Sequence, residues 1–271
     1  MKLDKFQSQI FFTTVRITIP DNQGEGASIG TGFIYSTPLP NDPKNRSITL
    51  LISNKHVFGN PNNKIIINFH KKNSETFAPL LGEAVVLEQE NFSNNYFSHP
   101  SDEIDLACMN VSFIEREENN IYHKSLHPNF FANFNENEIL PGSDILFIGY
   151  PENRFDTTHN LPILRKGVIA TIPAVDFNGK KQFIIDAQVL PGSSGSPVFV
   201  IAKNKYKLAG VVSATMIKHQ KLTTLPVNYD FGIQQTLGLG IVLKKVLVEE
   251  LIKSVVDKVE KSIKEKEIKN L

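Results

Sequence analysis

The chain has 271 residues, 41% of them hydrophobic and 21% charged, an ordinary composition for a globular protein able to bury a sizeable core. Its formal net charge of +1 provides no dominant attraction to nucleic acid or to an anionic membrane. No stretch approaches the length of an apolar transmembrane helix, so we expect neither nucleic acid nor a membrane among its partners.

Short β-strands separated by turns are predicted along most of the chain. Residues 11–19 alternate Thr and Arg with Phe, Val and Ile, as a half-buried strand does. Clusters of Pro, Asn and Asp at 38–43 and of Asn and Pro at 60–63 mark turns. The further candidate strands are 29–36, 48–53, 64–69, 83–88, 104–112, 143–149, 166–172, 182–188, 197–202 and 207–213. Many short strands at this spacing predict a barrel or a sandwich.

A histidine and an acidic residue stand at the ends of two of these strands. The apolar strand 48–53 ends in a short polar break, and His56 lies at its mouth. Asp105 immediately precedes the apolar run Leu-Ala-Cys, whereas Asp102 and Glu103 come earlier and are expected to be solvated. An imidazole acts best as a general base when a carboxylate fixes its tautomer, so His56 and Asp105 are candidates for such a pair.

A glycine-flanked serine lies much further along the chain. Ser194 falls between Gly192 and Gly195, on a turn that runs straight into the apolar strand 197–202. A Gly/Ser/Pro cluster alone is usually an ordinary turn. With a general base available, however, such a turn can expose a nucleophilic hydroxyl and aim backbone N–H groups at one point beside it. Acyl transfer requires both features.

These residues resemble those of a trypsin/chymotrypsin-superfamily serine endopeptidase, and the chain is most similar to the HtrA/Deg branch. The order His56, Asp105, Ser194 is that of chymotrypsin, and it differs from subtilisin and from α/β-hydrolases. The resemblance extends over about residues 10–255. Further matching segments are 28–34, 147–151, 166–169, 185–187, 210–214 and 238–241.

The resemblance implies an all-β fold of two six-stranded antiparallel barrels with the active site between them. Residues 1–125 would form the N-terminal barrel and carry His56 and Asp105, and residues 126–242 would form the C-terminal barrel and carry Ser194. Within this arrangement, the polar segment 113–140 would connect the barrels. The segments 150–165 and 214–236 are expected to be long loops that shape the cleft.

An amphipathic helix is predicted over residues 243–271. From Leu243 onward, apolar residues recur at three- and four-residue steps with Lys and Glu between them. The helix would pack on the barrel and end in a charged tail. Alternatively, it would mediate self-association as a short coiled coil, or dock a partner. We expect no PDZ domain, the peptide-sensing module of HtrA-type enzymes.

The resemblance also implies a role for each residue of the candidate site. Ser194 would be the nucleophile, His56 the general base and then the acid, and Asp105 the group that orients the imidazole. The backbone of Gly192, Ser193 and Ser194 would form the oxyanion hole.

The primary specificity pocket is expected to be uncharged and apolar. Gln188 occupies the position at which trypsin places the Asp that selects Lys and Arg, and Val189 and Leu190 follow it. Three further residues would pair with the backbone of a polypeptide substrate as an added strand: Ser213, Ala214 and Thr215.

Two departures from the trypsin pattern bear on activation and location. Ser193 stands where trypsin-type enzymes carry the Asp that pairs with a new N-terminus, so we expect a site that is competent as made or ordered by a partner or substrate. The single cysteine, Cys108, excludes an intrachain disulfide. Because secreted relatives generally use several disulfides, and the N-terminus does not read as a secretory signal, we expect a cytoplasmic protein.

Two other functions remain open at this point. The chain could be a catalytically silent relative that binds extended peptides, or a protease dedicated to one partner in a signalling or defence system. The remaining histidines show no metal-ligand spacing and are expected at the surface or in loops, and there is no glycine-rich phosphate loop. We therefore expect neither a metal nor a cofactor.

Overall fold

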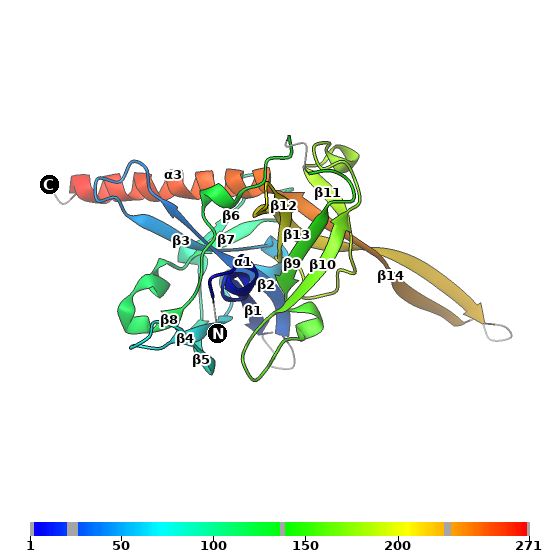
Figure 1. Cartoon of the computed structure of the whole chain (residues 1–271), viewed down its shortest axis with the longest axis horizontal. Helices are drawn as coiled ribbons and strands as arrows, with labels where there is room; N and C mark the ends of the chain where they lie inside the picture. The colour runs from blue at the N-terminus through cyan, green and yellow to red at the C-terminus, as the bar shows by residue number, and fades with distance from the viewer. Residues whose placement is uncertain (1–2, 21–26, 136–138, 225–228, 270–271) are drawn as a thin grey trace.

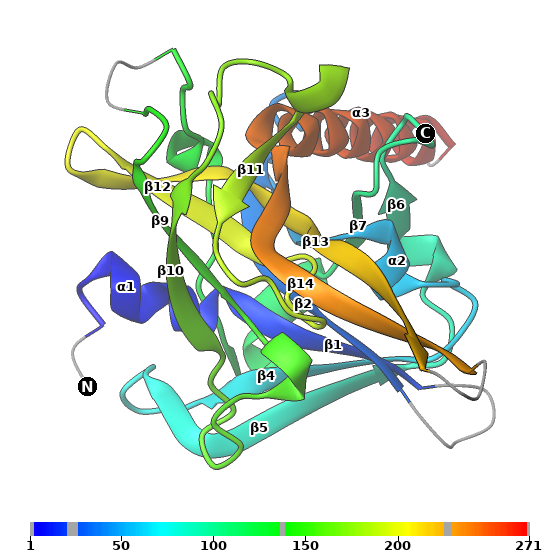
Figure 2. The same cartoon turned by 90° about the vertical axis from the view of Figure 1, so that its right-hand side faces the viewer.

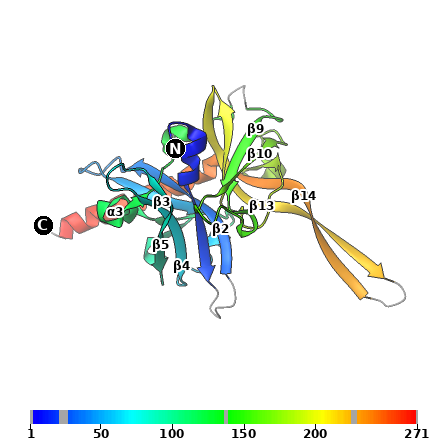
Figure 3. The ribbon, with the colours of Figure 1, turned by 60° about the horizontal axis from the view of Figure 1, so that its bottom comes forward.

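Two β-structures lie side by side, and an element projects from each end of the molecule (Figure 1). The computed structural model describes residues 3–20, 27–135, 139–224 and 229–269, without the side chains of 219–224, 229–234 and 268–269. A long helix, α3, extends at one end of the molecule, and a two-stranded arm formed by β13 and β14 extends at the other (Figures 1 and 3). The two short helices are α1 (Phe6–Gln9) and α2 (Lys55–Phe58).

The first half of the chain forms one antiparallel sheet in the order β5-β4-β1-β2-β3-β7-β6, with β8 paired to β4. The strands are β1 (Thr14–Pro20), β2 (Ala27–Pro38), β3 (Ser47–Ser53), β4 (Ile65–Lys72), β5 (Pro79–Gln89), β6 (Tyr96–Ser98), β7 (Ala107–Asn110) and β8 (Ile121–Tyr122). Alternating side chains such as Val15, Ile17 and Ile67 are buried in a core inside this sheet, as period-two alternation requires.

The expected all-β, chymotrypsin-like fold is confirmed, but the first half is an eight-stranded sheet where a six-stranded barrel was expected. Six of the eight correspond to the strands predicted up to residue 112. The two additional strands, β6 and β8, are three and two residues long. Such short strands show too few residues for hydrophobic alternation to reveal them.

The second half forms a closed six-stranded barrel in the order β10-β11-β14-β13-β12-β9. The strands are β9 (Asp144–Gly149), β10 (Ile163–Ile169), β11 (Gln182–Asp186), β12 (Pro197–Ala202), β13 (Lys205–Thr224) and β14 (Tyr229–Lys244). Fully buried side chains from opposite walls fill the barrel, among them Phe183, Val198, Val212 and Val242. Figure 2 looks toward this half of the molecule.

The segment 214–236 is not the expected loop. Strands β13 and β14 stay paired beyond the barrel, from Ile217 opposite Thr236 to Thr224 opposite Tyr229, and form the arm seen in Figures 1 and 3. The prediction was wrong because the polar run 218–221 reads as a loop in the sequence. In the structure, the backbone of residues 218–221 is hydrogen-bonded to β14. The composition of one strand alone does not reveal such a partner.

Helix α3 (Lys245–Lys269) joins the two halves. Its buried side chains, among them Leu247, Leu251 and Val255, share one core with Leu50 of β3 and Leu208 of β13. The helix begins at residue 245 rather than 243, because Leu243 and Lys244 still pair in β14. Further along, the carboxylate of Glu260, a buried residue, accepts hydrogen bonds from Asn41 N–H (2.7 Å) and Nδ2 (2.8 Å). This contact anchors the helix to the turn between β2 and β3.

Candidate functional site

His56 is presented by the one-turn helix α2, directly after β3. Val57 and Phe58 of that turn are buried, and the imidazole on its other side is half exposed. Gly30 of β2 permits this packing, because a Cβ at that position would overlap the side chain of Val57. The apolar residues of α2 therefore fix this turn against the core, and the His56 side chain remains accessible at the surface.

Asp105 accepts hydrogen bonds from both the imidazole and the backbone of His56. His56 Nδ1 donates to Asp105 Oδ2 at 2.6 Å, and the backbone N–H of His56 donates to Oδ1 at 3.1 Å. Asn54 Nδ2 in turn donates to the backbone carbonyl of Asp105 at 2.7 Å. The hydrogen bond to Oδ2 places the imidazole proton on Nδ1 and leaves the lone pair of Nε2 available to accept a proton.

A tight turn precedes Ser194. The N–H of Ser193 donates to the Leu190 carbonyl at 3.0 Å, with Pro191 and Gly192 at the two central positions and a Gly192 φ of 85°. These are the features of a type II turn, which favours Pro first and Gly second. A Cβ at Gly192 would also overlap the Tyr150 carbonyl oxygen, so glycine is required for space as well as for φ.

The orientation of the central peptide of this turn is fixed from outside. The backbone N–H of Glu152 donates to the Pro191 carbonyl at 2.6 Å, and Thr31 Oγ1 donates to the Gly192 carbonyl at 2.8 Å. Because the C=O and N–H of a trans peptide point in opposite directions, the N–H of Gly192 points away from Glu152. Among the residues that the structure describes, the N–H groups of Gly192 and Ser194 have no acceptor, whereas that of Ser193 closes the turn.

The residues after the turn are equally constrained. The N–H of Thr31 donates to the Ser194 carbonyl at 2.9 Å, and the N–H of Gly195 donates to the Val212 carbonyl at 2.9 Å. Gly195 has a φ of 85°, and a Cβ there would overlap the Thr31 carbonyl oxygen and Ser53 Oγ. Backbone from β2 and β13 therefore holds the serine from both sides.

Ser213 brings the serine and the carboxylate together. Ser194 Oγ donates to the Ser213 carbonyl at 3.3 Å, and Ser213 Oγ donates to Asp105 Oδ2 at 3.4 Å. Within the described part of the chain, no hydrogen bond joins Ser194 Oγ directly to the His56 ring. The structure thus gathers all three candidate residues around one point, with Ser213 as the shared neighbour.

A loop that crosses from the barrel to the first sheet carries Glu152. Arg16 of β1 donates from Nη1 to Asn153 Oδ1 at 2.9 Å, and its guanidinium carbon lies 4.6 Å from the ring centroid of Phe155. Glu152 and Asn153 adopt positive φ values of 47° and 56°, which non-glycine residues rarely do. Sequence reasoning missed this anchor, because nothing local connects a strand arginine with a loop 137 positions away.

The residues expected to contact substrate have different surroundings. Gln188 is exposed and Leu190 is half-buried, whereas Val189 belongs to the barrel core and contacts the backbone at Gly240. Ala214 is exposed. Ser213 and Thr215 on either side of it are half-buried.

A cavity of about 590 Å³ adjoins the site, lined by Asp105, Ser213, His99, Lys181 and Glu250 among others. His99 is buried, with Nε2 3.4 Å from Glu250 Oε2, and burial lowers its pKa. His99 lies in the loop after β6, as the expectation of surface or loop positions for the other histidines allows, although it is buried there. The expectation is wrong for His70, which is buried in β4, whereas His219 lies outside the residues with described side chains.

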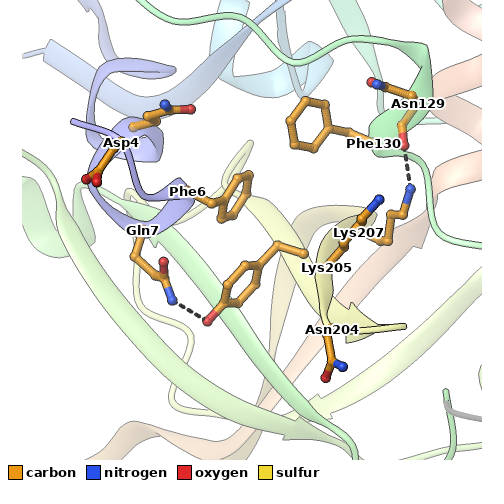
Figure 4. A pocket seen from close by; sticks show the side chains of 10 residues that line it. Asp4, Phe6, Gln7, Asn129, Phe130, Asn204, Lys205 and Lys207 are labelled. Atoms are coloured by element: carbon orange, nitrogen blue, oxygen red, sulfur yellow. Dashed lines mark hydrogen bonds between the residues drawn. The ribbon is translucent and has the colours of Figure 1, made fainter.

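A second cavity, of about 610 Å³, lies between the N-terminal segment and the β12–β13 turn (Figure 4). The Phe6 ring stacks on Tyr206 with centroids 4.8 Å apart, and Gln7 Nε2 donates to the Tyr206 hydroxyl at 2.7 Å. Opposite them, Lys207 Nζ donates to the Asn129 carbonyl at 2.6 Å (Figure 4). None of the lining residues is a candidate site residue. The cavity is a gap between the N-terminal segment and the barrel.

Neither a metal cluster nor a membrane-spanning helix is found in the described ranges. No group of three or more His, Cys, Asp or Glu side chains there is arranged to hold a metal ion. No helix among those residues is both long and apolar enough to cross a bilayer.

The comparison with protein families defines the class of this protein. Residues 30–206 match the trypsin-like peptidase domain, which is more than half of the chain, so the chain belongs to that family. No curated protein matches the sequence.

Two solved structures resemble this fold. The serine endoprotease from Yersinia pestis aligns with a TM-score of 0.52 at 15% identity, over 92% of this chain and 64% of that one. The Rv3671c protease from M. tuberculosis, in its active form, aligns with a TM-score of 0.47 at 15% identity, over 91% and 82% of the two chains. This chain therefore spans 64% of the length of the Yersinia protein.

Proposed function

We propose that this protein is a serine endopeptidase that hydrolyses peptide bonds through His56, Asp105 and Ser194. The observation that carries the proposal is the convergence of the His56–Asp105 pair and the Ser194 hydroxyl on Ser213. It is supported by two backbone N–H groups, of Gly192 and Ser194, that have no acceptor among the described residues. Nucleophile, base and oxyanion donors are what acyl transfer needs.

The proposed reaction has two stages. As substrate binds, the Ser194 hydroxyl turns from the Ser213 carbonyl to His56 Nε2, which takes its proton while Oγ attacks the scissile carbonyl. The N–H groups of Gly192 and Ser194 stabilise the oxyanion, and His56 then protonates the leaving amine as the C–N bond breaks. A water molecule, deprotonated by His56, hydrolyses the acyl-enzyme and frees Ser194.

The same geometry supports a site that is competent as made. The type II turn at Leu190–Ser193 is held by Glu152 and Thr31 of this same chain. Ser193 contributes its N–H to that turn, so its place in the oxyanion hole is structural and Gly192 and Ser194 are the donors. No new N-terminus is required to hold the turn.

We further propose an uncharged primary pocket and a cytoplasmic location. Gln188 and Leu190, on the segment that leads into the turn, give no anionic group that would favour a Lys or Arg side chain. Cys108 is buried, burial raises the pKa of its thiol, and as the single cysteine it forms no intrachain disulfide. A fold that uses no disulfide is compatible with a reducing compartment.

The test is active-site labelling with a fluorophosphonate probe, combined with cleavage of an unfolded protein substrate. We expect the wild-type protein to react and cleave, and Ser194→Ala to do neither. Ser196→Ala, which removes a buried hydroxyl two residues further along the chain, should keep labelling. Labelling that survives Ser194→Ala would contradict the assignment. A wild-type protein that binds extended peptides without labelling or cleavage would instead be a silent binding module.

A further inference from the structure

One edge of β13 is free over the whole length of the arm. Strand β12 pairs with β13 only between Lys205 and Val211. On the opposite edge, β14 pairs with β13 out to Thr224. Among the strands that the structure describes, none pairs with the first edge beyond Val211, although the backbone of Val212 still bonds Gly195 and Ser196. The backbone groups that follow on this edge are left without a ladder partner, and the strand has register shifts against β14 between Val212 and Ala214 and between Thr215 and Ile217.

This free edge begins at the nucleophile. Ser213, whose carbonyl accepts the hydrogen bond from Ser194, is its first position beyond Val212, and Ala214 next to it is exposed. The edge then leads away from the barrel toward the tip of the arm (Figures 1 and 3). An unpaired strand edge is a template for an extended peptide, whose main-chain hydrogen bonds supply the affinity.

The direction of pairing decides which part of a substrate lies on the arm. Both strands that flank β13 run antiparallel to it, and antiparallel pairing is the more stable arrangement. A peptide added antiparallel to β13 begins at the arm and reaches Ser194 with its carboxyl-terminal end. The arm would therefore contact residues upstream of the scissile bond.

The sequence of the arm indicates what kind of segment would bind. Along β13 beyond Val212 there are two lysines, Lys218 and Lys221, and no Asp or Glu, whereas the returning strand β14 carries one acidic residue, Asp230, opposite Thr223. Lys218 is exposed, and at the base of the arm the Ile217 and Leu237 side chains are 41% and 49% exposed. Acidic and apolar residues are thus favoured over basic ones. A third strand would also stabilise a two-stranded ribbon that is marginal by itself.

We propose that, beyond the residues Ser213–Thr215 already expected to pair with substrate, the free edge of β13 from Met216 to Thr224 binds the upstream segment of an acidic, extended polypeptide substrate as an added antiparallel strand. This rests on the proposed peptidase function and adds a substrate class to it. The substrates are unfolded or extended chains with roughly ten residues available before the scissile bond, the length that the edge can pair. Short surface loops of folded proteins cannot supply such a strand.

The first experiment needs no variant. Cleavage is measured for a ladder of peptides that share one scissile site and whose acidic upstream part grows from two to roughly ten residues. We expect kcat/KM to rise by about tenfold or more along the ladder, since each added pair contributes backbone hydrogen bonds. N-methylation of single upstream amides should lower kcat/KM at alternate positions only, because every second N–H of a strand faces its neighbour.

The second experiment removes the arm beyond its first pairs. Residues 219–234 are replaced by an Asn-Gly turn between Lys218 and Gln235, which are opposite each other in the ladder. We expect kcat/KM of this variant to stop rising once the upstream part exceeds about five residues, the length that the remaining edge up to Lys218 can pair. Exchange of acidic residues further upstream for lysine should then have no effect. The fluorophosphonate reaction reports separately on Ser194.

Three outcomes would overturn the proposal while leaving the peptidase function in place. These are a kcat/KM that does not depend on upstream length in the wild-type protein, an N-methyl scan without alternation, and an equal length dependence in the shortened variant. Failure of the wild-type protein to label or to cleave any peptide of the ladder would overturn the peptidase function itself.

Discussion

The turn that carries Ser194 and the arm formed by β13 and β14 belong to the same barrel, but they are held in different ways. The turn receives hydrogen bonds from Thr31 of the first sheet and from the loop at Glu152, and its Gly195 donates to Val212. Beyond the barrel, the arm is held by the pairing of its own two strands. Backbone groups are satisfied at the turn, except for the two N–H groups proposed for catalysis, and are left open along one edge of the arm.

This difference separates two requirements of a peptidase. Oxyanion stabilisation needs donors fixed in advance, since reorganisation during the reaction would cost part of the gain. Binding an extended chain needs free backbone that can pair with many sequences. We therefore expect substitutions around the turn to have large effects on turnover and on stability, and substitutions along the arm to have small effects on both.

The largest effect is expected at Asp105. In Asp105→Asn, the group beside His56 is no longer an anion and can favour the wrong imidazole tautomer, so kcat should fall by about 10⁴-fold with the fold intact. The matched control is Asp102→Asn, an exposed carboxylate three residues earlier, for which kcat should not change. Steady-state kinetics measure both variants, and equal losses in the two would refute the role of Asp105.

A large loss of stability is expected at Gly195. Alanine there must adopt a φ of 85° and also overlap the Thr31 carbonyl oxygen, so Gly195→Ala should cost more than about 3 kcal/mol in the free energy of unfolding. Gly142 has a φ of 86° with no atom near the position of a Cβ. Gly142→Ala should therefore cost only about 1–2 kcal/mol, the backbone component alone. Denaturant titration compares them, and similar costs would show that the crowding at Gly195 is relieved by small shifts.

A smaller effect is expected where the loop at Glu152 is anchored. Asn153→Gly keeps the left-handed backbone but removes the acceptor of Arg16, so the Glu152 N–H should hold Pro191 less firmly. We expect kcat to fall by about threefold to tenfold with little change in KM, in line with the loss of one partly exposed charged hydrogen bond. Asn160→Gly, at a φ of 55° in the same loop, is the control. If KM rises while kcat is unchanged, the loop contacts substrate and does not position the turn.

Much of the site could be predicted from the sequence because each element is local. Alternation identified six strands of the first sheet, and the glycine pattern around Ser194 identified a turn whose φ values only glycine adopts readily. The contacts that bring these elements together were harder to predict from the sequence. Ser213 was expected only to pair with substrate, whereas in the structure it also contacts Ser194 and Asp105.

The remaining features depend on contacts between distant residues. The Arg16–Asn153 hydrogen bond links residues that carry no mutual sequence signal. The arm was expected to be a loop, and its strand conformation comes from cross-strand pairing that only the fold supplies. Helix α3 likewise shares a core with Leu50 of β3 because of where the first sheet lies. The periodicity of the helix predicts an apolar face but does not predict which residues that face contacts.

The smallest effect is expected at Ile217, where β13 passes from the barrel to the arm, and Val212 of the same strand is the comparison. Val212 is fully buried in the barrel core, and Ile217 is 41% exposed at the base of the arm. Val212→Thr places a hydroxyl in an apolar core and should cost about 1–3 kcal/mol, whereas Ile217→Thr should change the free energy of unfolding by less than about 0.5 kcal/mol. Denaturant midpoints at constant m-value measure both. Equal costs would mean that the Ile217 side chain at the base of the arm is packed as tightly as the barrel core.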